Sequence, residues 1–161
     1  MLLSLLLQPL TSRIMFDSYP GNSKVWIYTS NREINVNEQV AIQSELDQFM
    51  KEWAAHGNSL FGEAKILEDR FVVLVVDESM VSASGCSIDT SVNFMKSIGQ
   101  KFDIDFFDRL NMTIESDGEK KRVHISELKD HEDAFVYNPM ITSLSELRTN
   151  WKVKVSESPF V

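Results

Sequence analysis

Hydrophobic residues recur along the chain in two helix-like stripes. The first stripe consists of Ile42, Leu46, Phe49, Met50 and Trp53. These positions fall on one face of a helix with charged residues between them, which predicts an amphipathic helix. Asn35 followed by Glu38 predicts a capping box at its start, and Gly57 after His56 predicts a left-handed cap at its end.

The second stripe predicts another helix further along the chain. It consists of Ile88, Val92, Met95, Ile98 and Phe102. Ser87 or Asp89 is expected as its N-cap, because both side chains can accept a hydrogen bond from the first turn. Gly99 is expected to end the helix, since a glycine inside a helix costs about 1 kcal/mol relative to alanine.

Short runs rich in strand-forming residues predict a sheet. Lys24–Thr29 follows a turn signal and is expected to form the first strand. Ala64–Leu67 and Arg70–Asp77 are expected to form a hairpin, with an acidic pair between them. The second arm contains six consecutive apolar residues, Phe71–Val76, typical of a strand covered on both faces. The first arm carries Lys65, which is typical of an edge strand.

The last third of the chain has weaker patterns. Residues 110–115 and 122–126 both alternate, and Asp117-Gly118 between them predicts a second hairpin. Short helices are expected over residues 125–130 and 143–151. Residues 152–161 are expected to be irregular or to form a short strand.

The order of these elements predicts an α+β fold. Strand, helix, strand, strand, helix, strand is the order of a ferredoxin-like βαββαβ plait, here with an extra strand and a C-terminal helical extension. The first and third strands of such a plait are central, in agreement with the two runs that lack polar alternation. Two helices cover only one face of the sheet. We expect either residues 135–151 or a second subunit, in a homodimer, to cover the other face.

Composition and length agree with one folded domain. The chain has 161 residues, of which 43% are hydrophobic and 25% charged, with only 6 Gly and 4 Pro. It opens with the apolar run MLLSLLL, which is too short for a membrane span and has no basic residue before it. We expect residues 1–14 to be a flexible tail or to precede a true start at Met15; an ordered docked segment and an export signal are the alternatives. Residues 15–161 are expected to form a single α+β domain.

Charge and cysteine usage limit the partners and the compartment. The formal net charge of −8 argues against nucleic acid or an anionic membrane as the main partner, and no membrane insertion is expected. The single cysteine, Cys86, has no partner for an internal disulfide, which favours a cytoplasmic protein.

Chemistry-bearing residues are expected to meet at one end of the predicted sheet. The first helix ends there, the third strand ends there, and the loop into the second helix starts there, whereas Arg32 is expected at the opposite end. The candidate site consists of His56, Asp77, Glu78, Ser82, Ser84, Gly85, Cys86, Ser87 and Asp89.

Three kinds of chemistry are open to this cluster. Cys86 at a helix N-terminus would be favoured as a thiolate, and His56 is the one histidine expected near enough to act as its base. Asp77 and Glu78, joined by His56, offer hard ligands for a metal ion. The small polar residues before the second helix could hold an anion on backbone N–H groups. Packing, capping and solvation explain the same residues without any site.

Several strings in the chain carry a resemblance to a known family. YPGNSKVWIYTSNRE, FMKEWAAHGNSL, RFVVLVVDES and SGCSIDTSVNF together resemble a family of small, uncharacterised bacterial proteins, some of which are labelled "ABC transporter ATPase". The resemblance runs from about Tyr19 to the C-terminus and implies no catalytic residue. The label itself conflicts with the sequence, because a Walker A loop needs a Gly-Lys pair and none of the six glycines precedes a lysine.

The first functional hypothesis is therefore a cytoplasmic, non-enzymatic domain that binds a small anionic ligand or a protein partner. The alternatives are a small thiol-dependent enzyme that uses Cys86 with His56, and a metal-assisted hydrolase or transporter-accessory protein. The sequence identifies no cofactor.

Overall fold

The fold is built from two larger antiparallel sheets, of three and four strands, and a separate two-stranded sheet, with helices around the first of the larger sheets. The structure is a computed structural model, and it describes residues 16–161; the predictions for residues 1–14 lie outside this range. The principal helices are α3 (Val36–Glu52), α4 (Gly85–Phe102) and α5 (Leu144–Thr149). The strands are β1 (Lys24–Thr29), β2 (Ala54–Ala55), β3 (Asn58–Ser59), β4 (Phe61–Leu67), β5 (Phe71–Asp77), β6 (Asn111–Ser116), β7 (Glu119–His124), β8 (Phe135–Tyr137) and β9 (Lys152–Lys154). Short 3-10 helices span Ile125–His131 and Val155–Glu157.

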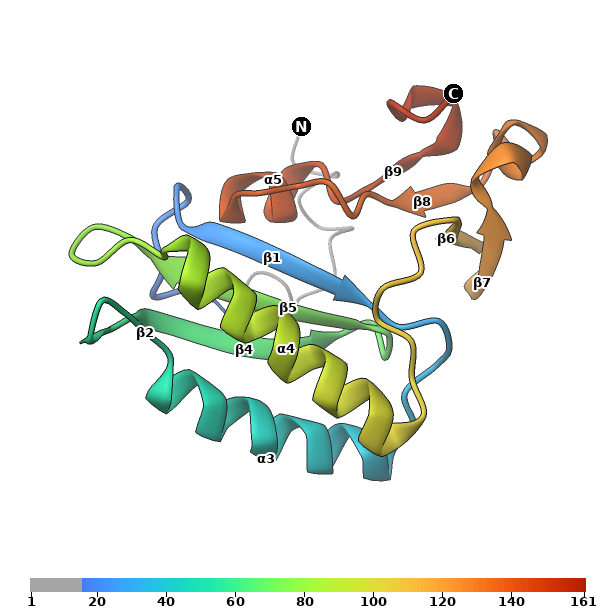
Figure 1. Cartoon of the computed structure of the whole chain (residues 1–161). Coiled ribbons are helices and arrows are strands. Elements are labelled where there is room, and N and C mark those ends of the chain that lie inside the picture. The colour runs from blue at the N-terminus through green and yellow to red at the C-terminus, as the bar shows by residue number, and fades with distance from the viewer. Residues whose placement is uncertain (1–15) are drawn as a thin grey trace.

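The first sheet has the order β1-β5-β4, with both pairs antiparallel. Residues 71–76 of β5 are fully buried, which confirms the prediction of a strand covered on both faces. The predicted hairpin is also confirmed, and β4 lies at the sheet edge as expected. Helices α3 and α4 lie side by side on one face of this sheet, while α5 lies on the other (Figure 1).

The start of α3 confirms the predicted capping box, but its end differs from the prediction. The Asn35 side chain accepts from the Glu38 N–H, and the Glu38 carboxylate accepts from the Asn35 N–H. The helix ends at Glu52, so the expected C-terminal cap at Gly57 is wrong. His56 and Gly57 have φ of 50° and 78° and form the turn between β2 and β3. Two successive positive φ values are those of a tight hairpin turn, and glycine favours them as it does a helix cap.

Helix α4 is confirmed, but both of its predicted ends are wrong. Its N-cap is Ser84, rather than Ser87 or Asp89. Gly99 lies inside the helix, and Asp103 in the left-handed conformation ends it. The glycine is needed for close packing, because a Cβ there would lie 2.5 Å from the backbone oxygen of Ile104.

The C-terminal segment covers the second face of the first sheet, which confirms one of the two expected arrangements. Phe71 of β5 contacts Trp151 edge-on and Tyr137 at a tilt, with ring centroids 4.9 and 5.0 Å apart. The buried cluster on this face also includes Leu144 and Leu147 of α5. This face is therefore buried without a second subunit.

The second sheet has the order β7-β6-β8-β9 and contains the predicted Asp117-Gly118 hairpin. The strand order does not confirm the four-stranded plait, because β6 pairs with β7 and β8 and not with β1. Among the described residues, β1 is thus an edge strand of the first sheet, where it was expected to be central. Within residues 16–161, no helix is long and apolar enough to cross a membrane.

Candidate functional site

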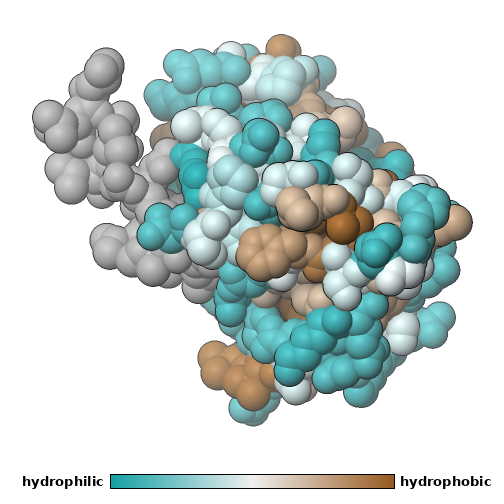
Figure 2. Space-filling view, turned by 90° about the vertical axis from the view of Figure 1, so that its left-hand side faces the viewer, coloured by the Kyte–Doolittle hydropathy of each residue, from teal (hydrophilic) through white to brown (hydrophobic). Residues whose placement is uncertain are grey.

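The elements that carry the sequence-predicted site meet at one end of the first sheet, where α3 and β5 end and the loop into α4 starts (Figure 1). The indole N–H of Trp53, after α3, donates to the backbone oxygen of Ser87 in α4 at 2.8 Å, which ties the two helix ends together. Arg32 lies at the opposite end, as expected, where it donates to the backbone oxygen of Phe102. The end with the predicted site has a mainly hydrophilic surface around a small hydrophobic patch (Figure 2).

The thiol and the imidazole of this site are not joined. Cys86 and His56 are both exposed, and no hydrogen bond links them among the described residues. His56 lies in the β2–β3 turn and not in a helix. The pairing of Cys86 with His56 therefore stays a prediction without a geometric contact to support it.

The first turn of α4 is capped by its own side chains. The Ser84 hydroxyl accepts from the Ser87 N–H at 3.1 Å, and the Ser87 hydroxyl accepts from the Ser84 N–H at 2.6 Å. Glu78 accepts from the Ala83 N–H at 2.7 Å, which fixes the preceding loop. The N–H groups of Ala83, Ser84 and Ser87 already have acceptors within the chain, so fewer N–H donors are left for an anion than the sequence suggests.

The remaining members of the predicted site show no ligand geometry. Asp77 accepts from the Ser79 N–H at 3.0 Å and thus shapes a turn. Ser82, Gly85 and Asp89 are exposed. Across residues 16–161, no group of three or more histidine, cysteine or acidic side chains could hold a metal ion.

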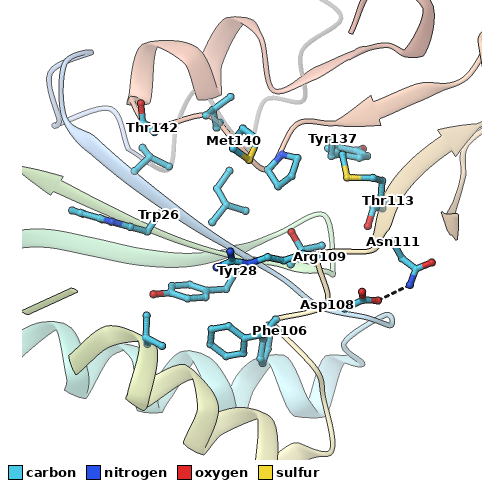
Figure 3. A pocket seen from close by; sticks show the side chains of 18 of the residues that line it. Trp26, Tyr28, Phe106, Asp108, Arg109, Asn111, Thr113, Tyr137, Met140 and Thr142 are labelled. Atoms are coloured by element: carbon cyan, nitrogen blue, oxygen red, sulfur yellow. Dashed lines mark hydrogen bonds between the residues drawn. The ribbon is translucent and has the colours of Figure 1, made fainter. Parts of the chain in front are cut away.

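A large cavity lies beside the free edge of β1 and was not predicted. Its volume is about 860 Å³, and it is lined by all of β1, by parts of residues 106–113 and 137–142, and by side chains of α4. Figure 3 shows labelled side chains from these segments facing one another across β1, with Phe106 on one side and Met140 on the other. The cavity occupies the space between the first sheet and the second.

Arg109 is the principal charged group of this cavity. Figure 3 shows its side chain beside β1 near Tyr28, toward the middle of the cavity. The residue is exposed, and it forms no ion pair with another described residue. Lys24, at the start of β1, is a second lining cation without an ion pair in the same part of the chain. With Arg122, the lining carries three cations against two anions, Glu78 and Asp108, on a protein whose net charge is −8.

A partly buried ion pair forms one wall of the cavity. The Arg122 guanidinium lies 3.3 Å from the Asp108 carboxylate and also donates to the Thr113 hydroxyl at 3.1 Å. Hydrogen bonds from Asn111, the Leu110 N–H and Arg122 hold the pKa of the Asp108 carboxyl below its usual range. Burial lowers the pKa of Arg122, and its Nε is buried without a hydrogen-bond partner in the described chain. Because the two charges of this pair cancel, it adds no net charge to the cavity.

The other walls of the cavity are mainly apolar. Tyr28 contacts Phe107 edge-on at 5.8 Å between ring centroids, and its hydroxyl bonds to Ser91 at 2.8 Å. Burial raises the pKa of the Tyr28 phenol, which therefore stays neutral. Met140 is 70% exposed at the opposite wall, so much of its side chain is open to solvent. The arrangement suits a ligand with an apolar body and an anionic group.

Glu78 is the one member of the sequence-predicted site that also lines this cavity. The groups that dominate it, Arg109 and Met140, were missed because the cavity joins three segments that are far apart in the sequence. One local signal was available. Phe106-Phe107-Asp108-Arg109 combines two aromatic and two charged residues in a stretch with neither helical nor strand periodicity.

Comparison of the chain with protein-family models, with curated proteins and with solved structures gives no significant match.

Proposed function

We propose that this protein is a non-enzymatic binding domain whose ligand occupies the cavity beside β1. The three strands of the first sheet keep the order of the first three strands of a ferredoxin-like plait, and the cavity lies where a fourth strand would pair with β1. Within the described range, no strand of this chain occupies that position. The proposal keeps the sequence-based function but moves the site away from the N-terminus of α4.

One observation carries the proposal. Arg109 places a guanidinium without an ion-pair partner from the described residues in a cavity with aromatic and methionine walls. A hydrogen bond between a charged donor and an anionic acceptor contributes about 1.5–3 kcal/mol. The expected ligand therefore combines an anionic group at Arg109 with an apolar body against Phe107 and Met140.

A fluorescent amphipathic anion tests the proposal. We expect 1-anilinonaphthalene-8-sulfonate to bind with a stoichiometry of one per chain and to gain fluorescence in the apolar cavity. Arg109→Gln removes the cation while keeping a polar side chain, and we expect it to weaken binding about 10-fold or more, the equivalent of about 1.5 kcal/mol.

Lys51→Gln is the matched control. It removes the same charge from an exposed position in the last turn of α3, away from the cavity, so we expect less than a twofold change in affinity. Far-UV circular dichroism checks that both variants are folded, so that a change in dye binding reflects the site. Equal weakening by the two substitutions, or none by either, would contradict the proposed site.

A further inference from the structure

The floor of the cavity is a strand edge with free hydrogen-bonding groups. The Val25 N–H donates to the Thr142 backbone oxygen at 3.0 Å, away from β5. In an antiparallel pair the backbone groups of alternate residues point to the same side. Ile27 and Thr29 therefore also point their N–H and C=O groups away from β5 and toward the cavity.

This free edge is bounded at both ends by the chain itself. Residues 142–144 pair with the start of β1, through the Thr142 oxygen and the Leu144 N–H. Beyond β1, the Asn31 N–H donates to the Asp105 backbone oxygen at 3.0 Å. Between these two contacts, no backbone hydrogen bond from the described residues reaches Ile27 or Thr29.

The free stretch has the dimensions of a short peptide. It covers the four residues from Trp26 to Thr29, because the Val25 N–H is already bonded to Thr142. At roughly 3.3 Å per residue, four or five residues of extended chain would lie along it. Successive side chains of an added strand point to opposite faces, one toward the α4 side and the next toward residues 139–142. Both faces are apolar, with Phe106 and Met140 as examples, so apolar residues fit on each side.

We infer that the ligand of this cavity is an extended, mainly apolar peptide segment that carries a carboxylate and adds to β1 as a fourth strand. This inference rests on the proposed function and names its ligand class. Strand addition gives affinity through the backbone groups of Ile27 and Thr29, and specificity through the side-chain walls. The carboxylate pairs with Arg109, whose charge has no counterion among the described residues.

A second copy of this chain fits the edge less well. The free edge lies between two walls, residues 106–109 and 139–142, so a single peptide strand can reach it more readily than the edge of a folded sheet. Two copies would also bring together two chains that each carry a net charge of −8.

A designed peptide library tests the inference. Its members are acetylated pentapeptide amides with a central Glu and with Val, Leu, Phe or Thr at the other positions. We expect the best members to displace 1-anilinonaphthalene-8-sulfonate and to slow hydrogen exchange of the Ile27 and Thr29 amides at least 10-fold at saturation. Replacing the central Glu by Gln should weaken binding about 10-fold. Methylating the alternate peptide nitrogens whose N–H groups face β1 should abolish binding, whereas methylating the other set should not.

A backbone variant separates strand pairing from side-chain contact. Thr29→Pro removes an N–H that faces the cavity, without removing a bond to β5, and proline is tolerated at such edge positions. Thr29→Ala keeps the N–H and is the matched control. We expect Thr29→Pro to weaken the peptide at least 10-fold and the dye less than threefold, and Thr29→Ala to change neither by more than threefold.

The outcomes distinguish the two proposals. Dye binding that depends on Arg109, with no library member that displaces the dye or protects Ile27 and Thr29, would overturn the peptide inference and leave the binding site standing. A concentration-dependent dimer in sedimentation that Thr29→Pro dissociates would also overturn it, since the occupant would then be a second copy. Dye binding that ignores Arg109→Gln would overturn the proposed function itself.

Discussion

Two glycines of helix α4 have opposite surroundings. Gly99 packs against the backbone of Ile104, where an added Cβ would lie 2.5 Å from an oxygen atom that cannot move away alone. Gly85, in the first turn, lies in open space, and a Cβ added there would meet no atom within 4 Å. The same residue type is thus a packing requirement at one position and a conformational cost at the other.

Gly99→Ala should destabilise the protein. Overpacking a well-packed site costs about 1–3 kcal/mol, and the better helix propensity of alanine offsets up to about 1 kcal/mol of that. A net loss of about 1–2 kcal/mol corresponds to a Tm lower by roughly 2–8 °C in a domain of this size. Differential scanning calorimetry measures it. Gly85→Ala is the control and should leave the Tm unchanged or slightly higher; a Tm of Gly99→Ala equal to that of the parent would contradict the packing.

Cys86→Ser should leave both stability and binding unchanged. The side chain is exposed and does not line the cavity, so the substitution removes no buried contact. We expect a Tm within about 2 °C of the parent, because surface substitutions generally change stability by less than about 0.5 kcal/mol. Dye affinity should change by less than twofold. A marked loss of dye affinity would instead favour a site at the N-terminus of α4.

Of two hairpin turns with positive φ, the sequence predicts Asp117-Gly118 as a turn but not His56-Gly57. Asp117-Gly118 is a standard signal for a two-residue turn, and the structure has it there, with φ of 52° and 79°. His56-Gly57 was assigned to a helix end, because a left-handed glycine suits both a helix cap and a hairpin turn. The helix end predicted at Gly99 rests on the cost of a glycine inside a helix; its close contact with Ile104, which requires the glycine there, exists only in the tertiary structure.

At the scale of elements, Arg32 clamps the start of α3 to the end of α4. It donates to both carboxylate oxygens of Glu38, at 2.8 and 2.7 Å, and to the backbone oxygen of Phe102 at 2.7 Å. The Glu38 carboxylate belongs to the capping box of α3, and Phe102 is the last residue of α4. One side chain therefore donates hydrogen bonds to acceptors at two helix ends. These helix ends lie at the end of the sheet opposite to the predicted site.

The Arg32–Glu38 pair should make stability fall in acid. Hydrogen bonds from Arg32, above all, lower the pKa of Glu38 to about 2 in the folded protein, against an ordinary value of 4.5. A lowered folded-state pKa contributes stability that is fully present above about pH 4.5 and is lost as the pH falls toward 2. Because Arg32 is partly exposed, we expect Glu38→Gln to cost about 1 kcal/mol at pH 7.

Urea unfolding at pH 7, 4 and 2.5 measures this difference. The gap in the free energy of unfolding between the parent and Glu38→Gln should shrink steadily as the pH falls. Glu63→Gln, in the looser pair with Lys65 at 3.5 Å, is the control and should show a gap of less than about 0.5 kcal/mol at each pH. A constant gap for Glu38→Gln would mean that the carboxylate titrates normally in the fold.

Elements were predicted better than their pairing. The periodicities of α3, α4, β5 and the β6–β7 hairpin are local, so the sequence contains them in full. The pairing of β6 depends on residues far away in the sequence. Met112 and Ile114 would alternate with polar residues in the same way whether the strand paired with β1 or with β8, so the pattern does not choose between them. The cavity depends on this one choice, because β6 next to β1 would fill it. This is why the candidate site could not be found from the sequence.

At the scale of the whole molecule, the first sheet lies between two hydrophobic clusters, one on each of its faces. The helix-side cluster contains Trp53, and the opposite cluster contains Trp151 and Leu144. Strand β5 contributes to both, with alternate residues on each face. Lys120 of the second sheet pairs with Glu68, in the β4–β5 turn, at 3.2 Å. These contacts predict that the layers unfold together.

Leu144→Ala should therefore lower the stability of the whole fold. Leu144 is fully buried against the first sheet, and truncating such a side chain costs about 2–5 kcal/mol. We expect the urea midpoints by tryptophan fluorescence and by far-UV circular dichroism to fall together, as in a two-state transition. Ser145→Ala, on the exposed face of α5, is the control and should change neither midpoint. Two separated transitions would show that the C-terminal layer unfolds independently.

The central claim is that the ligand site lies between the two sheets, beside the free edge of β1, and not at the head of α4. Nitrogen-15 NMR of the full chain during titration with 1-anilinonaphthalene-8-sulfonate tests it most directly. The account predicts saturable shifts for the Arg109 Nε–H and for the amides of Ile27 and Thr29, with the amides of Cys86 and Ser87 unmoved. Saturable shifts confined to residues 84–87, with Arg109, Ile27 and Thr29 unmoved, would contradict it.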